Sequence, residues 1–301
     1  MKIAILMSSY NGEKYIRQQI DSILSQSGAV QPELWVRDDG STDGTRAVLE
    51  SYASQGKLRW YTGDNLKPAH SFLDLLKHCE DYDYYAFADQ DDVWKPEKLI
   101  SGIRALEAIS GPGLYFANAE LVDQDLNSLG RTVYRRSPAL DFTTLSCAGG
   151  ILGCTMVFNR QLAQLIRMAP MPGPVVMHDF YVALVCSLFD GEIVYDPVAQ
   201  MGYRQHGKNV VGVARGKTAA IRDRIRSVTQ RATVTVAEQA ASVLAAFPEK
   251  QDSEKFRWLE KLAACSGAVV PRIQVSCSRK THYVSLEKSM TLRLAILLGN
   301  R

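Results

Sequence analysis

The sequence places three carboxylates within four residues, directly after a short apolar run. The run is Tyr84–Ala88, and the residues that follow read Asp89-Gln90-Asp91-Asp92. Carboxylates this close repel one another, and burying them without a counter-charge is costly. A divalent cation supplies that charge, and oxygen ligands suit Mg²⁺ or Mn²⁺, for which a bound phosphate often completes the site. Taken alone, the pattern leaves a solvated acidic turn before the next helix as the alternative, and it is the rest of the chain that favours a metal site.

A second acidic cluster, Asp38–Ser41, ends another apolar run, and the polar segment Ser8–Asn11 ends the first run of the chain. Carboxylates in such places can accept hydrogen bonds from a base N–H or from ribose hydroxyls. We expect Asp38 and Asp39 to face a ligand, and Asp43 to cap the helix that follows. Neither GxGxxG nor GxxxxGK[ST] is present, which disfavours a dinucleotide cofactor and a P-loop kinase.

Two positions in the middle of the chain can also carry chemistry. Asp179, beside His178, follows a proline-rich connection and precedes an expected helix. Its carboxylate can act as a general base for a hydroxyl group or can cap the helix, and the local pattern alone favours the cap. His206 can bind a metal or a phosphate, although a lone histidine is more often structural.

Alternating strands and helices must position the polar clusters at 8–11, 38–41 and 89–92. We expect strands over residues 3–7, 33–38, 58–61, 84–88 and 114–118, and helices over 13–26, 44–55, 68–79 and 96–109. This alternation predicts an α/β fold with a mostly parallel, Rossmann-like sheet flanked by helices. Ligands bind such sheets beyond the carboxyl ends of the strands. The clusters at 8–11, 38–41 and 89–92 all follow strands, so we expect one site.

After residue 118 the alternation loosens. We expect a polar hairpin region over 120–131, a glycine-rich loop entering a strand over 149–158, helices over 160–166 and 180–189, and a strand over 192–195. From about Gly212 the sequence is helical and basic, with no strand signal. Residues 1–212 hold 19 Lys and Arg against 25 Asp and Glu, and residues 213–301 hold 16 against 7. The chain is therefore an acidic body with a basic tail.

The composition is that of a folded protein. Its 301 residues are 46% hydrophobic and 22% charged, enough for one large α/β domain with an appendage. The six cysteines form no CxxC pair, so we expect reduced thiols rather than disulfides or a zinc site. No apolar stretch reaches the ~18 residues of a membrane-spanning helix, and the N-terminus shows no cleavage pattern. We expect a cytoplasmic protein.

The basic tail offers two alternatives. Basic amphipathic helices can lie on anionic membranes, which would put the protein on the inner face of the plasma membrane. The alternative is packing against the body of the protein or against a second copy in a homodimer. The residues concerned are Ile221, Ile225 and Val228 with Arg222, Arg224, Arg226 and Arg231, and later Leu292, Leu294, Ile296, Leu297 and Leu298 with Lys288, Arg293 and Arg301.

Taken together, the motifs resemble the family-two glycosyltransferases with the GT-A fold. The resemblance covers about residues 1–212 and rests on Ser9–Gly12, Asp38–Asp43 and Asp89–Leu99. The later segments Gly153–Asn159, His178-Asp179 and Arg204–Val210 are similar to the bacterial rhamnosyltransferase-like branch. The order and spacing of these motifs carry the resemblance more than any one of them.

The resemblance implies a catalytic domain at 1–212, with a nucleotide-sugar half at about 1–118 and an acceptor half at about 119–212, and a helical extension at 213–301. It implies that the nucleotide-sugar is held by Ser9, Tyr10, Asn11, Asp38, Asp39, Asp89 and Gln90. Asp91 and His206 would bind Mg or Mn at the diphosphate, and Asp179 would deprotonate the acceptor hydroxyl. Residues that would contact the acceptor or support the site are Asp92, Trp94, Gly153, Cys154 and His178.

The implied reaction is an inverting, metal-dependent transfer that uses one base and no protein nucleophile. Many relatives carry Glu at the position of His178, which leaves the role of that position open. The QxxRW motif of processive relatives is absent, so we expect transfer of a single sugar.

The branch resemblance favours L-rhamnose from dTDP-rhamnose, moved to a saccharide or lipid-linked acceptor in bacterial surface polysaccharide biosynthesis. A UDP-hexose donor is the alternative, because uracil and thymine share the same imide edge. A catalytically inactive nucleotide-sugar binding protein is a further alternative, against which Asp91 and Asp179 argue. A nucleotidyltransferase would normally carry a glycine- and lysine-rich N-terminal loop, which is absent. We expect no nucleic-acid partner.

Overall fold

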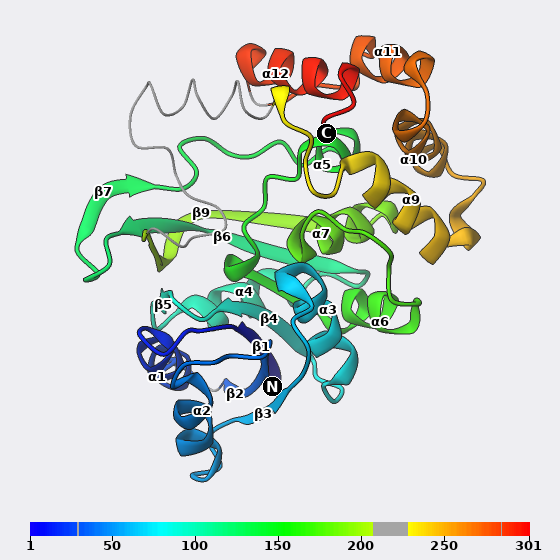
Figure 1. Ribbon diagram of the computed structural model, residues 1–301. Helices are drawn as coiled ribbons and strands as arrows, with labels where there is room; N and C mark the ends of the chain where they lie inside the picture. The colour runs from blue at the N-terminus through cyan, green and yellow to red at the C-terminus, as the bar shows by residue number, and fades with distance from the viewer. Residues whose placement is uncertain (29, 207–227, 284) are drawn as a thin grey trace. The chain divides into compact units, whose positions relative to one another are not determined.

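The computed structural model describes residues 1–28, 30–206, 228–283 and 285–301 (Figure 1). It divides into two compact units. The first unit comprises Met1–Ser137, Leu152–Arg167 and Gly191–Gly212, and the second comprises Pro138–Ile151, Met168–Asp190 and Val213–Arg301. The boundary expected at 212 is the end of the last segment of the first unit, and the second unit also takes in two earlier segments. Arg222, Arg224 and Arg226 lie outside the described residues.

The first unit contains one mixed sheet. In the described residues its order is β3-β2-β1-β4-β8-β6-β9-β5, and β7 pairs with β6. The strands are β1 (Lys2–Ser9), β2 (Gln31–Asp38), β3 (Arg59–Thr62), β4 (Tyr84–Asp89), β5 (Val93–Trp94), β6 (Gly113–Val122), β7 (Ser128–Thr132), β8 (Met156–Asn159) and β9 (Glu192–Arg204). Strands β1 to β4 run parallel, β8 is antiparallel to both β4 and β6, and β6 is parallel to β9.

Helices cover both faces of the parallel part of the sheet. The helices of the first unit are α1 (Ile16–Leu24), α2 (Thr45–Ala53), α3 (Lys67–His78), α4 (Lys98–Leu106) and α6 (Arg160–Met168), of which α4 packs against β6, β8 and β9. Helices α1 and α2 lie on one side of the strands and α3 lies on the other, as a doubly wound sheet requires (Figure 1). Ile3–Met7 of β1 are fully buried, because both faces of that strand are covered.

Several elements differ in length from the sequence prediction. Helix α1 begins at Ile16 rather than residue 13, because the preceding residues form turns in which the amides of Tyr15 and Ile16 both donate to Gly12 O. Strands β6 and β9 are longer than expected, because they pair with each other along their length despite two register shifts. The hairpin expected over 120–131 is confirmed as the β6–β7 pair.

The second unit is helical in the described residues. Its helices are α5 (Phe142–Ala148), α7 (His178–Leu188), α9 (Val236–Ala246), α10 (Glu254–Ala263), α11 (Val269–Cys277) and α12 (Leu286–Leu297). The described part of the tail contains no strand, as predicted. Across the described residues, none of these helices combines the length and the apolar character that crossing a membrane demands.

Candidate active site

The register of the parallel strands brings the three polar clusters to one edge. Ser9 at the end of β1 pairs with Asp38 at the end of β2, and Ser8 pairs with Asp89 at the end of β4. The loops that leave these strands therefore begin side by side, where a doubly wound sheet binds its ligands.

The loop after β1 is held by Gln90 and Asn11. The Gln90 side chain accepts from the Tyr10 amide at 3.0 Å and donates to the Tyr10 carbonyl at 3.0 Å. Asn11 has a φ of 49°, and its Oδ1 accepts from the amide of Thr42 at 2.8 Å. A Cβ on Gly12 would lie 2.1 Å from Gln90 Oε1, so a side chain there would displace Gln90 from its present position. The loop leaves the Tyr10 ring 48% exposed at the edge of the sheet.

Asp38 is buried at the end of β2. Its carboxylate accepts from the Ser41 amide at 3.0 Å and from Arg46 Nε at 2.9 Å. Burial would raise its pKa, but the hydrogen bonds from Ser41 and Arg46 hold the pKa below its usual value. Asp38 stays ionised inside the protein and fixes the turn after β2, and its contact with a ligand stays a prediction.

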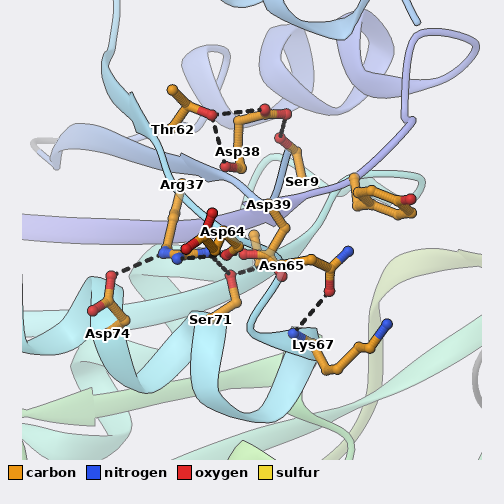
Figure 2. A network of polar contacts seen from close by, with 12 residues as sticks. Ser9, Arg37, Asp38, Asp39, Thr62, Asp64, Asn65, Lys67, Ser71 and Asp74 are labelled. Carbon is orange, nitrogen blue, oxygen red and sulfur yellow. Dashed lines mark hydrogen bonds and ion pairs between the residues drawn. The ribbon is translucent and has the colours of Figure 1, made fainter. Parts of the chain in front are cut away.

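Asp39 is buried in a second network, which Figure 2 shows. Its carboxylate forms an ion pair with Arg37. The same guanidinium binds Asp74 at 2.9 Å and donates to the carbonyl of Asp64 at 3.0 Å. This cation neutralises the charge of Asp39, and the network ties the turn after β2 to α3. The expected contact of Asp39 with a ligand likewise stays a prediction.

Asp91 and His206, the two residues implied as metal ligands, lie in contact. His206 Nε2 is 2.7 Å from Asp91 Oδ2, and both side chains are largely buried. The His206 ring stacks on Tyr15, with 5.2 Å between centroids. Arg204, at the end of β9, donates through Nε to the Asp91 carbonyl at 2.6 Å. The pair joins the end of β4 to the end of β9.

Asp92 lies behind that pair and is fully buried. Its Oδ1 accepts from the amide of Arg204 at 3.0 Å, and its Oδ2 has no hydrogen-bond partner among the described residues. Burial, followed by the charges of Asp91 and Asp89, raises its pKa well above the usual value. Possible ligand atoms of Asp89, Asp92 and Cys154 lie within 4.8 Å of one another.

The residues named as acceptor contacts or supports lie inside the protein. Those that the structure buries are Asp92, Trp94, Gly153, Cys154 and His178. Their role at the acceptor or in support of the site stays a prediction. Burial also lowers the pKa of His178 to about 3, so its imidazole is neutral at physiological pH.

Lys98 is a residue of this region that the sequence reasoning missed. It is fully buried, and its Nζ has no hydrogen-bond partner among the described residues. The Nζ lies 3.8 Å from the centroid of the Trp94 ring. Burial lowers its pKa to about 7, against the opposing influence of Cys154 and Asp92. A lysine in the first turn of a helix opposes the helix dipole, and Lys98 also falls in the first turn of the helix expected over 96–109.

Asp179 lies in the second unit, in the first turn of α7. Every other residue of this helix is buried, so Asp179 is the one polar position that α7 leaves partly exposed. Its Oδ1 accepts from the amide of Phe180 at 2.6 Å. The residue at the N-cap is Met177, which makes no side-chain cap, so Asp179 does not hold the cap position. The alternative of a helix cap is therefore wrong for this residue.

Comparison with known proteins shows which family the chain resembles. The model of Glycosyl transferase family 2 matches residues 4–163, more than half of the chain. The dTDP-rhamnosyl transferase RfbG of Shigella flexneri is 27% identical over 221 residues, which cover 68% of this chain and 73% of that protein. The UDP-Glc:alpha-D-GlcNAc-diphosphoundecaprenol beta-1,3-glucosyltransferase WfgD of Escherichia coli is 27% identical over 191 residues, 64% of this chain and 71% of that protein.

A solved structure is similar in fold. The crystal structure of S. aureus TarS 1-349 in complex with UDP has a TM-score of 0.56 and 17% sequence identity to this chain, and the match covers 88% of this chain and 70% of that chain. The likeness confirms the predicted GT-A fold, with its α/β sheet flanked by helices.

Proposed function

The chain belongs to glycosyl transferase family 2 and is a glycosyltransferase, and on this premise we propose that it moves a single sugar from a nucleotide-sugar to an acceptor hydroxyl with inversion. The acceptor is a saccharide or a lipid-linked saccharide of a bacterial surface polysaccharide. The observation that carries the proposal is the contact between Asp91 and His206, beside the loop that presents the Tyr10 ring.

The proposed donor site is the edge formed by the ends of β1, β2 and β4. The exposed Tyr10 ring can stack on a pyrimidine base, because stacking on an aromatic face needs no particular base edge. Ser9 and Asn11 hold the loop through Asp38 and Thr42. The buried carboxylates of this edge thus contribute by shaping the loops that receive the nucleoside.

The residues present fit a divalent metal. Asp91 offers an oxygen and His206 a nitrogen, and these two atoms lie 2.7 Å apart. Further possible ligand atoms of Asp89, Asp92 and Cys154 are grouped within 4.8 Å of one another. This donor set suits Mn²⁺ and, through its carboxylates and added water, Mg²⁺. We propose that Asp91 and His206 hold such an ion. When bound, it would neutralise the charge of the departing nucleoside diphosphate.

Asp179 is the proposed general base. Its position at the exposed start of an otherwise buried helix gives a carboxylate that the protein holds in place. It would remove the proton of the acceptor hydroxyl as that oxygen attacks the anomeric carbon, and the nucleoside diphosphate would leave from the opposite face. One base suffices for such a displacement.

We propose dTDP-L-rhamnose as the donor, on the similarity to RfbG and to the rhamnosyltransferase-like branch. A UDP-hexose is the second candidate, favoured by the similarity to WfgD, whose name gives UDP-Glc as its donor. That name also gives a diphosphoundecaprenol acceptor, which supports a lipid-linked acceptor and a workplace at a membrane surface for this chain.

The test is a donor panel. The purified chain is incubated with dTDP-rhamnose, UDP-glucose and UDP-galactose, with Mn²⁺ or Mg²⁺, and the release of free nucleoside diphosphate is measured. We expect the fastest release from dTDP-rhamnose. A clear preference for a UDP-sugar would retire the rhamnose donor and leave the rest of the proposal standing.

The matched control is a pair of carboxylate variants. Asp91→Asn should reduce release by about 10²-fold or more, because a carboxylate ligand of the proposed ion is lost. Asp125→Asn removes an exposed carboxylate from the β6–β7 turn and should leave the rate unchanged. Equal rates in the two variants would overturn the role of Asp91.

A further inference from the structure

Helix α12 has apolar residues on two faces, and the structure covers only one of them. Leu292, Ala295 and Ile296 are buried against the second unit. Leu286, Met290, Leu294 and Leu297 follow at helical spacing along another face, and all are exposed, with Leu286 at 79% and Met290 at 64%. A helix that is apolar on both faces normally has both of them covered.

The neighbouring helix α11 carries a second exposed apolar face. Val269, Val270 and Ile273 are all exposed, at positions one and four residues apart on the helix. Helices α11 and α12 pack beside each other, in orange and red in Figure 1. We refer to the seven exposed residues on these two helices as the α11–α12 apolar surface. Large exposed apolar surfaces mark sites of protein or membrane contact.

The same segment is strongly basic. Residues 264–301 contain six Lys and Arg and a single acidic residue, Glu287. Arg293 donates to the carbonyls of Thr281 and Ser278, and Arg272 donates to the carbonyl of Cys265. Carbonyl partners hold these guanidinium groups in place without neutralising them. Lys280 forms an ion pair with Glu254, and Arg301 donates to the carbonyls of Cys147 and Ala148. The exposed side chains of Arg279 and Lys288 therefore supply the positive charge that the segment presents beside its apolar side chains.

We propose that the α11–α12 apolar surface inserts into an anionic lipid surface. Apolar side chains on an interfacial helix enter the boundary between headgroups and acyl chains, while Lys and Arg attract anionic headgroups. A second copy of the chain is a poorer occupant, because a two-fold contact would bring the same cations together on both sides. The proposal concerns the tail alone and does not depend on the donor or the acceptor.

The surface differs from the one that the sequence indicated. Of the apolar residues expected to meet a membrane, Leu292 and Ile296 are buried. Leu286 and Met290, which the sequence reasoning did not name, are among the most exposed. Leu294 and Leu297, which were named from the sequence, lie on the α11–α12 apolar surface, so that surface shares part of the expected set.

The test measures binding of the full-length chain to vesicles by co-sedimentation. Vesicles of phosphatidylcholine with phosphatidylglycerol should bind the protein, and vesicles of phosphatidylcholine alone should bind it several-fold less. Binding should weaken as salt rises from about 0.1 M to about 0.5 M, because salt screens the attraction between cations and headgroups. Absence of binding to the anionic vesicles would overturn the proposal.

Two pairs of substitutions distinguish binding through the α11–α12 apolar surface from non-specific adsorption to lipid. Leu286→Gln with Met290→Gln should lower vesicle binding by about tenfold or more, since the two side chains no longer enter the lipid. Met168→Gln with Val198→Gln changes two comparably exposed apolar residues outside α11 and α12, and should leave binding unchanged. Equal binding by both variants would overturn the proposal. Thermal unfolding of each variant shows whether it is folded.

A third variant and a second measurement complete the test. Arg279→Gln with Lys288→Gln removes two exposed cations and should reduce binding to anionic vesicles only. Light scattering gives the oligomeric state: a dimer that Leu286→Gln with Met290→Gln dissociates, together with no vesicle binding, would make the surface an interface between copies. Nucleoside diphosphate release, measured in parallel without lipid, reports on the proposed reaction independently of these outcomes.

Discussion

Asp179 is the residue on which the proposed chemistry depends most directly. Asp179→Asn keeps the size of the side chain and its hydrogen bond to the Phe180 amide but removes the base. We expect turnover to fall by roughly 10²–10⁴-fold with little change in donor affinity. Steady-state kinetics and calorimetric donor titration measure the two quantities.

The control for this change is Asp252→Asn, which alters an exposed carboxylate of the second unit. It should leave turnover unchanged. If Asp179→Asn instead lost donor affinity at nearly constant turnover, Asp179 would act in building the site rather than as its base.

Lys98, unlike Asp179, is a residue that we expect to destabilise the fold. A buried ammonium without a hydrogen bond is unfavourable, and Met fills a similar volume over the Trp94 ring without that cost. We expect Lys98→Met to raise the free energy of unfolding while lowering kcat/KM, because costly residues persist where function needs them. Lys95→Met, at an exposed lysine three residues before the start of α4, should change neither.

The pH dependence of stability gives a second measure of Lys98. Its pKa of about 7 in the folded chain lies below the value of ~10.4 for an unfolded lysine, so between these values the unfolded state binds more protons. The contribution of Lys98 to stability should therefore increase as pH rises through this window. Chemical unfolding of wild type and Lys98→Met across that pH range measures this contribution as the difference between their free energies of unfolding. A difference that does not change with pH would contradict a lysine whose pKa is lowered by burial.

At the scale of secondary-structure elements, the cap expected at Asp43 is wrong, because Gly44 holds the N-cap of α2 and Asp43 accepts from the Thr45 amide at 3.0 Å. Helix α9 begins at a capping box, in which the Thr235 side chain accepts from the Glu238 amide at 3.2 Å and Glu238 Oε2 accepts from the Thr235 amide at 2.7 Å. Thr235→Ala should lower the free energy of unfolding by ~1 kcal/mol. Chemical denaturation measures this loss, and Thr291→Ala on α12 is a control that changes no cap. An equal loss of stability in both variants would show that the capping box is not its cause.

The length of a strand was predicted well only where its own residues carry the pattern. The alternating apolar runs of β1, β2 and β4 predicted those strands within two residues of their ends. Strand β9 continues through Asp196 and Pro197 to Arg204, where polar residues interrupt the pattern. The length of β9 follows from its pairing with β6. Pairing between segments that are distant in sequence is hard to predict from a few neighbouring residues.

At the scale of the whole molecule, ligand binding should appear as stability. UDP or dTDP at ~100 times its dissociation constant should stabilise the chain by ~2.7 kcal/mol, because it binds only the folded state. If Asp91 and His206 hold an ion that faces the diphosphate, EDTA should remove most of this shift while uridine, which lacks the diphosphate, gives a smaller shift with or without EDTA. Thermal unfolding measures all four conditions. A full shift for the diphosphate in EDTA, with Mg²⁺ and Mn²⁺ verified absent, would contradict the metal site.

The sequence by itself determined the α/β half of the fold and the edge on which its polar clusters meet. Both follow from local patterns: apolar alternation indicates strands and helices, and parallel strands place their carboxyl ends together. The motif order also indicated the family, which the comparison confirmed.

Only the tertiary structure decided how those side chains are used. It brought Asp91 to His206 across 115 positions of sequence, buried Asp38 and Asp39 against their own cations, and left one apolar face of α12 uncovered. The physical reason is common to all three. A local pattern shows which side chains share a face, but the partner that neutralises a charge or covers an apolar surface comes from a distant part of the chain.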